Sequence, residues 1–294
     1  MHLSLLTLVL AQAPPAPAQA LAIFDYDAKA PVEFHEQGRE IVEGATVADV
    51  SFASPKGGRV PAYLVTPPSG RGPFAGIVFM HWGQGDRTEF LAESLRYAKS
   101  GVVSLMIDAP YHRPDAKEFA FIADAPAERD MFIQLVVDLR RAVDVLLARS
   151  DVDPKRIAYV GHSLGATWGG PLAGVEKRIG SFVLMGGLPR VSDVLGDSAF
   201  ARQLQKSFKR EQLQAYADTL APIDPERFVG HAEPGRLLFQ FAQHDRYISA
   251  KAAADYEKAA RTAPGKRYFT SHEFNDEESA RDRQRWLYER LALK

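Results

Sequence analysis

The chain has 294 residues, 46% of them hydrophobic and 25% charged, a composition typical of a globular protein with a large apolar core. Its net charge is −1, with both signs interspersed, which excludes the strongly basic surface typical of proteins that bind nucleic acids or acidic membranes. The absence of cysteine excludes disulfides, thiolate metal sites and a cysteine nucleophile.

The first 20 residues differ from the rest of the chain. An apolar run over residues 3–10 leads into a stretch rich in Pro, Ala and Gln that ends at Ala18-Gln19-Ala20, a small-x-small pattern of the kind that signal peptidases cleave. We therefore predict a signal peptide over residues 1–20 and export of the protein to the periplasm or the medium. The alternatives are a disordered tail or an overcalled start codon on a cytoplasmic protein. The apolar run is too short to span a bilayer.

Residues 21–45 mix aromatic and acidic residues without a clear period, and we predict an arm packed on the edge of the domain. Residues 47–54 and 60–65 each alternate apolar and polar positions, and a turn sequence, Pro55-Lys56-Gly57-Gly58, lies between them. This pattern predicts an antiparallel hairpin. Residues 75–80 are continuously apolar instead, as is typical of a strand that is covered on both faces.

From residue 75 onward, strand-like apolar runs alternate with helical patterns. This alternation predicts a mainly parallel sheet with helices on both faces, and such sheets bind ligands at the carboxyl ends of their strands. No repeat or linker divides the chain, so residues 21–294 are expected to form one domain. The predicted strands are 75–80, 102–107, 157–160, 182–185, 237–242 and 267–270, and the predicted helices are 90–99, 127–149, 164–175, 250–260 and 277–293.

Residues 189–234 interrupt this alternation with charged, helical sequence. One interpretation is a solvated excursion on the surface. The other is a partial lid, because an insertion after the strand at 182–185 would overhang the carboxyl edge of the sheet.

A candidate nucleophile stands at the centre of the chain. Residues 161–165 read G-H-S-L-G, a G-x-S-x-G motif, directly after a predicted strand and directly before a helix rich in small residues. Five-residue patterns with two free positions also arise by chance, so the strand-turn-helix context is what makes the match specific. In that context the motif places Ser163 in a strained turn at the start of a helix, where negative charge is favoured.

A serine hydroxyl needs a base to take its proton, and the base needs an acid to orient it. Of the eight histidines, His272 fits best, because it follows the last predicted strand. Asp245 follows the strand before that and is the predicted acid. His244 is equally well placed but is chemically unsuited to orienting an imidazole. Asp108 is the alternative acid, although it is more readily explained as tying down the loop over residues 110–113.

Acyl transfer also needs hydrogen-bond donors for the developing oxyanion. We predict the backbone N–H of Leu164 as the first donor and that of Gly83, in the loop His81-Trp82-Gly83, as the second, with Trp82 as the alternative. His81, Trp82 and His162 are predicted to line the substrate pocket. Motifs for nucleotide or metal binding are absent from the sequence, so neither a cofactor nor a metal is expected.

From Phe24 to its C-terminus the chain resembles the α/β-hydrolases, and within them the bacterial dienelactone-hydrolase-like and acetyl-xylan-esterase-like proteins. The resemblance implies a mostly parallel eight-stranded sheet, a Ser-His-Asp triad and ester hydrolysis without a cofactor. Dienelactone hydrolases proper have cysteine where this chain has Ser163, so their substrate is not carried over, and Trp82 alters the oxyanion loop. The resemblance rests on Phe24-Asp25-Tyr26-Asp27, residues 60–65, the His81 loop, Asp108-Ala109-Pro110, the serine motif, Asp245 and His272.

We therefore predict a serine esterase that acts on a small-molecule ester through an acyl-enzyme on Ser163. The same motif does not distinguish esters from amides, so a serine peptidase or amidase is an alternative. A non-catalytic ligand-binding protein of the same fold is the third hypothesis.

Overall fold

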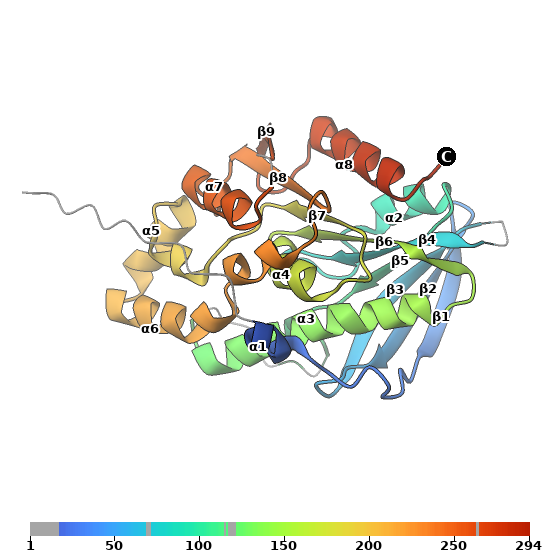
Figure 1. The fold of residues 1–294 in the computed structure, drawn as a ribbon, viewed down its shortest axis with the longest axis horizontal. Coiled ribbons are helices and arrows are strands. Elements are labelled where there is room, and N and C mark those ends of the chain that lie inside the picture. Colours follow the sequence, from blue (N-terminus) through green and yellow to red (C-terminus); the bar gives the residue numbers. More distant parts are fainter. Residues whose placement is uncertain (1–17, 69–71, 115, 117–121, 263–264) are drawn as a thin grey trace, which may run out of the picture.

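A computed structural model of the chain describes residues 18–68, 72–114, 116, 122–262 and 265–294. Its centre is a nine-stranded sheet with the strand order β1-β2-β3-β5-β4-β6-β7-β8-β9 (Figure 1). The strands are β1 (His35–Val42), β2 (Ala45–Ala53), β3 (Arg59–Thr66), β4 (Phe74–Met80), β5 (Val102–Ile107), β6 (Val152–His162), β7 (Ser181–Met185), β8 (Leu237–His244) and β9 (Lys266–Ser271).

The sheet is antiparallel at one edge and parallel elsewhere. β1, β2 and β3 pair antiparallel with their neighbours, and the strands from β5 to β9 all pair parallel. The predicted α/β fold with an N-terminal antiparallel hairpin is thereby confirmed. Because β4 to β9 run in one direction, their carboxyl ends meet at a single edge of the sheet, where α/β proteins bind ligands.

The number of strands differs from the eight that the resemblance implied. Residues 21–45 were predicted as an arm, but part of this segment forms the edge strand β1, which is bulged between Glu36 and Gly38. Seven of the eight residues of β1 are exposed. A strand that buries so little apolar surface lacks the alternating pattern by which the other strands of the hairpin were predicted.

Helices cover both faces of the sheet (Figure 1). Buried residues of α3, α4 and α7 form the core on one face, and buried residues of α2 and α8 form a second cluster on the other. The central strands β4 and β5 are almost wholly buried between the two layers, which explains their continuous apolar sequences. The helices are α1 (Ala18–Leu21), α2 (Leu91–Ala98), α3 (Ala125–Leu147), α4 (Leu164–Val175), α5 (Ala199–Ser207), α6 (Arg210–Leu220), α7 (Ala250–Ala259) and α8 (Glu277–Arg290).

The segment 189–234 contains a 3₁₀ turn, η3 (Val191–Leu195), followed by α5 and α6. Arg190, near the start of this segment, links it to α7 through an ion pair. The Arg190 guanidinium lies within 3.1 Å of carboxylate oxygens of Asp193, of Glu226 and of Asp255 on α7. Burial disfavours the charge of Arg190, but these carboxylates outweigh it and raise the pKa of the guanidinium above its ordinary value.

The predicted signal peptide lies outside the described residues except for Ala18, Gln19 and Ala20, which begin α1. No helix in the described ranges combines the length and the apolar character needed to cross a membrane.

Candidate active site

Ser163 stands in the tight turn between β6 and α4. Its backbone has φ +53° and ψ −107°, a conformation that L-residues adopt only when the surrounding structure enforces it. The two flanking glycines are part of that enforcement. A Cβ atom on Gly161 would lie 2.5 Å from the carbonyl group of Gly165, and one on Gly165 would lie 2.3 Å from the carbonyl oxygen of Met80. The turn therefore requires glycine at both positions, as the motif predicted.

The structure brings the three predicted triad side chains together. Nε2 of His272 lies 2.7 Å from Oγ of Ser163, and Nδ1 of the same ring lies 2.7 Å from Oδ2 of Asp245. With a carboxylate at Nδ1, the hydrogen of a neutral imidazole stays on that nitrogen, and the lone pair of Nε2 faces the serine hydroxyl. The histidine and aspartate side chains are only 1% and 2% exposed, so water does not compete for these contacts.

Asp245 is itself held in place by the loop after β8. Its second oxygen, Oδ1, accepts hydrogen bonds from the backbone N–H groups of Tyr247 (2.8 Å) and Ile248 (3.0 Å). The ring of Tyr247 also packs against that of His272, with 4.6 Å between the ring centroids. Both the acid and the imidazole are therefore fixed before any ligand binds.

The two predicted oxyanion donors face the same region. Within the described part of the chain, the backbone N–H groups of Leu164 and Gly83 donate to no protein acceptor. The two residues adjoin, because a Cβ on Gly83 would lie 3.1 Å from Cδ1 of Leu164. Trp82, the alternative donor, is already committed, since its N–H donates to Oε2 of Glu89 at 2.7 Å. Gly83 is therefore the better candidate of the two.

His81 was predicted to line the substrate pocket, but the structure places its side chain in the interior, where it is only 2% exposed. The side chain is buried beneath the loop, where Nε2 accepts the N–H of Ala109 at 3.1 Å and Nδ1 donates to the carbonyl oxygen of Trp82 at 2.6 Å. Burial lowers the pKa of His81 to about 4, so the ring is neutral near pH 7 and keeps the tautomer that these two bonds require.

His162 does not line the pocket either. Its Nδ1 lies 2.6 Å from Oε1 of Glu89, and its Nε2 lies 2.8 Å from the carbonyl oxygen of His272. Both ring nitrogens therefore lie against oxygen atoms of the protein. The ring stacks below Trp82, with 6.2 Å between centroids. Its contacts support the loop of His272 rather than a ligand.

Glu89 is a site residue that the sequence did not reveal. Its two carboxylate oxygens bind the N–H of Trp82, in the loop His81-Trp82-Gly83, and the ring of His162, and its side chain is 19% exposed. In the sequence it stands in a polar stretch just before α2, where a glutamate is common at a helix start. No spacing relates it to the serine motif, and only the fold shows its role.

The alternative acid, Asp108, lies away from the imidazole. Its Oδ1 accepts the backbone N–H of Arg87 at 2.8 Å, and its Oδ2 lies 3.5 Å from the side chain of the same arginine. It therefore orders the loop at Arg87 rather than residues 110–113. His244 is exposed, and its ring packs on Phe269.

A cleft opens beside Ser163. Ser163 and Leu164 are among the residues that line it. Trp82 and Gly83 line it, whereas His81 and His162 do not. The segment 189–234 contributes much of the outer wall, so it is not merely a solvated excursion. The apolar and aromatic residues of the lining are Trp82, Ile122, Phe132, Leu164, Trp168, Leu188, Val191, Val194, Phe200, Leu204, Tyr216, Tyr247 and Ile248.

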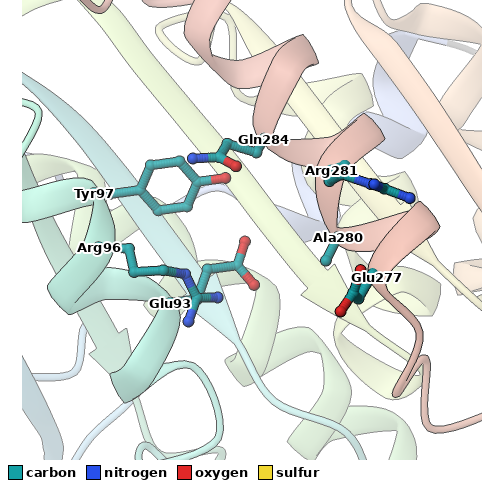
Figure 2. A pocket seen from close by; sticks show the side chains of 7 residues that line it. All are labelled: Glu93, Arg96, Tyr97, Glu277, Ala280, Arg281 and Gln284. Atoms are coloured by element: carbon teal, nitrogen blue, oxygen red, sulfur yellow. The ribbon is translucent and has the colours of Figure 1, made fainter.

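A second hollow lies between α2 and α8, on the opposite face of the sheet (Figure 2). It is lined mainly by charged and polar side chains, among them Glu93, Arg96 and Arg281. Glu93 is paired with Arg283 at 2.7 Å, and no serine or histidine is among the described residues that line the hollow. The candidate active site is therefore the cleft at Ser163. Among the described residues, no group of three or more histidine or acidic side chains is placed to hold a metal ion.

Comparison with known proteins relates the chain to esterases. The family model for acetyl xylan esterase (AXE1) matches residues 25–224, which is more than half of the chain. A search of curated proteins finds no match.

Solved structures with the same fold include two acetyl xylan esterases. That of Paenibacillus sp. R4 is 18% identical, with a TM-score of 0.76, and the match covers 94% of this chain and 96% of that one. Acetyl xylan esterase 1 of Thermoanaerobacterium sp. JW/SL YS485 is 16% identical, with a TM-score of 0.72 and coverage of 94% and 95%. A candidate dienelactone hydrolase of Klebsiella pneumoniae subsp. pneumoniae is 19% identical, with a TM-score of 0.59 and coverage of 82% and 97%. At these identities the structures show the fold.

Proposed function

Since the chain belongs to the acetyl xylan esterase family and is a carboxylic ester hydrolase, we propose that Ser163 is its nucleophile, with His272 as the base and Asp245 as the orienting acid. The observation that carries this proposal is the position of one imidazole ring. It contacts the serine hydroxyl through Nε2 and the buried carboxylate through Nδ1, each at 2.7 Å. A serine, a base and an acid in this relation are what acyl transfer requires.

In the first half of the reaction, Oγ of Ser163 bonds to the ester carbonyl carbon as its proton passes to Nε2 of His272. The carbonyl oxygen becomes an oxyanion, and the N–H groups of Leu164 and Gly83 are proposed to donate to it. When the tetrahedral intermediate collapses, the C–O bond to the alcohol breaks. Nε2 then gives its proton to the departing alkoxide, and the acyl group stays on the serine.

The second half releases the acid. Nε2 of His272 takes a proton from water, the resulting hydroxide attacks the acyl carbon, and the bond from that carbon to Oγ breaks. Nε2 then returns the proton to Ser163. Asp245 stabilises the imidazolium that forms in each half, which is why its two backbone hydrogen bonds matter.

The proposal is tested by the hydrolysis of p-nitrophenyl acetate. We expect Ser163→Ala to lower kcat by about 10⁴- to 10⁶-fold, because removal of a triad nucleophile leaves only the catalysis that comes from binding and the oxyanion donors. Retention of the wild-type rate in Ser163→Ala would refute the assignment. Ser150→Ala is the matched control for serine loss, because Ser150 is exposed and is not among the residues that line the cleft.

We also propose that residues 1–20 form a signal peptide, that the mature chain from residue 21 is exported as one domain, and that the segment 189–234 acts as a partial lid. The small-x-small pattern at Ala18-Gln19-Ala20 supports cleavage after Ala20. N-terminal sequencing of the protein from the periplasm or the medium would begin at Leu21. A full-length chain found only in the cytoplasm would contradict the proposed export.

A further inference from the structure

The cleft beside Ser163 offers a ligand very little to hydrogen-bond. Three of its polar lining residues are engaged by protein partners, whereas the exposed Gln84 and the indole N–H of Trp168, which has no hydrogen-bond partner among the described residues, are the exceptions. The Arg190 guanidinium is ion-paired with three carboxylates, the hydroxyl of Tyr216 donates to Glu128 at 2.8 Å, and that of Thr167 donates to the carbonyl oxygen of Ser163 at 2.9 Å. What remains on the surface of the cleft is mostly hydrocarbon and aromatic ring.

Such a surface suits one kind of ligand group. A sugar placed here would lose water from most of its hydroxyls and gain few hydrogen bonds in return, which disfavours its binding. A hydrocarbon group would gain from every methylene that it buries. Resting on the proposed function of Ser163, we propose that the cleft takes an apolar group of the ester, either a medium-length acyl chain or an apolar alcohol, so that the substrates are apolar esters rather than acetylated sugars.

Two residues of α5 in the outer wall of the cleft are placed to determine this preference. Phe200 and Leu204 are four residues apart on α5, so they lie on the same helix face, and both line the cleft. Phe200 is fixed there by its N–H, which donates to the carbonyl oxygen of Arg246 at 2.9 Å, and by its ring, which packs on Tyr247 at 5.1 Å. Leu204 is half-buried, and its side chain offers the cleft only hydrocarbon.

The first test uses the unmodified protein and compares kcat/KM across three series. One lengthens the acyl chain of p-nitrophenyl esters from acetate to octanoate, one lengthens the alcohol of acetate esters from methyl to octyl, and one uses acetylated xylose. Each buried methylene is worth about fourfold in kcat/KM at most. We expect a rise of about 10-fold or more along one of the first two series, and the series that rises shows whether the cleft holds the acyl or the alcohol group. If the shortest ester were the fastest in both series, or acetylated xylose were the best substrate, the proposal would be overturned.

The second test uses α5. Leu204→Gln keeps the side-chain length but places an amide in the wall, so the ratio of kcat/KM for hexanoate to that for acetate should fall by about 10-fold. Gln203→Ala, on the exposed side of the same helix, should leave both rates unchanged. An unchanged ratio in Leu204→Gln would show that the group does not lie against α5.

The two proposals fail in different ways. If the proposed function is wrong, Ser163→Ala will hydrolyse esters as fast as the wild type does. Failure of the substrate class would appear as Ser163-dependent hydrolysis that declines as the chain lengthens.

Discussion

Glu89 contacts both the loop His81-Trp82-Gly83 and the ring of His162, which supports the loop of His272. One carboxylate oxygen holds the oxyanion loop at the N–H of Trp82, and the other holds the ring of His162, which in turn donates to the carbonyl oxygen of His272. Loss of this side chain would free both loops. Because small misplacements of catalytic groups are costly, its effect should appear in the rate of the chemical step.

The prediction concerns two variants of this residue. Glu89→Ala should lower kcat for p-nitrophenyl acetate by about 10²-fold with little change in KM. Glu89→Gln should restore most of the rate, because the amide oxygen can still accept from Trp82 while its NH₂ group donates to His162. Equal activity of Glu89→Ala and the wild type would show that these contacts do not position the site.

His81 makes the stability of the fold depend on pH. Burial lowers its pKa from 6.5 to about 4 in the folded protein, so between these values the unfolded chain binds a proton that the folded chain does not. The free energy of unfolding attributable to His81 is therefore complete above pH 6.5 and declines as the pH falls towards 4, by about 3 kcal/mol at most.

The measurement is urea unfolding of the wild type and His81→Asn between pH 4 and 7. The asparagine amide can accept the N–H of Ala109 but does not titrate, so its stability should fall less steeply with acid. Parallel pH profiles for the two proteins would contradict the assignment of a neutral His81.

The site residues show how far the sequence could be interpreted at this scale. Ser163, Asp245 and His272 were predictable because each follows a strand whose apolar run is plain, and parallel strands end at one edge. Glu89 was not, because its role depends on where a loop folds back. His81 and His162 were predicted to contact a ligand because polar residues next to a catalytic motif often do. In the structure, their ring nitrogens form hydrogen bonds with backbone groups instead.

Among the elements, α8 is held against α2 by a buried ion pair. Arg283 contacts both carboxylate oxygens of Glu93 on α2, at 2.7 and 2.9 Å, and its third contact is with Gln240 on β8 at 3.1 Å. Burial opposes the charge on Glu93, but Arg283 outweighs it and lowers the pKa of the carboxyl. Removing the arginine would leave a buried carboxylate without its partner.

We expect Arg283→Met to lower the free energy of unfolding by about 3–5 kcal/mol, as measured by urea denaturation. The matched control is Arg39→Met, because Arg39 pairs with Glu36 on the exposed strand β1 and its side chain is 65% exposed. Loss of that pair should cost about 0–1 kcal/mol. Equal effects of the two substitutions would show that the α8 pair contributes no more than a surface contact.

The strands differ in how well the sequence predicts them. The run at 102–107 matches β5 at both ends, because a strand buried on both faces is apolar at nearly every position, here at all but Ser104. β6 begins at Val152, well before the predicted start at residue 157. Its first residues include the polar Asp153 and Lys155, so this part of the strand has no continuous apolar run. β1 was missed because pairing with β2, rather than burial of apolar side chains, makes it a strand.

At the scale of the whole molecule, the fold brings residues that are far apart in the sequence into contact. Ser163 and His272 are 109 positions apart and Asp245 and His272 are 27 apart, yet all three meet at the carboxyl edge of one sheet. The segment 189–234 then covers this edge and gives the cleft its apolar outer wall. The order of strands and helices in the sequence predicted that the three side chains meet at this edge. The apolar wall depends on how α5 packs, and the charged residues of the segment gave no sign of it.

The central claim is that His272 activates Ser163, and covalent labelling with a fluorophosphonate probe tests it most directly. Peptide mapping by mass spectrometry should place a single label on Ser163 in the wild type, no label in Ser163→Ala and far slower labelling in His272→Ala. A label on another residue, or labelling of His272→Ala at the wild-type rate, would contradict the account.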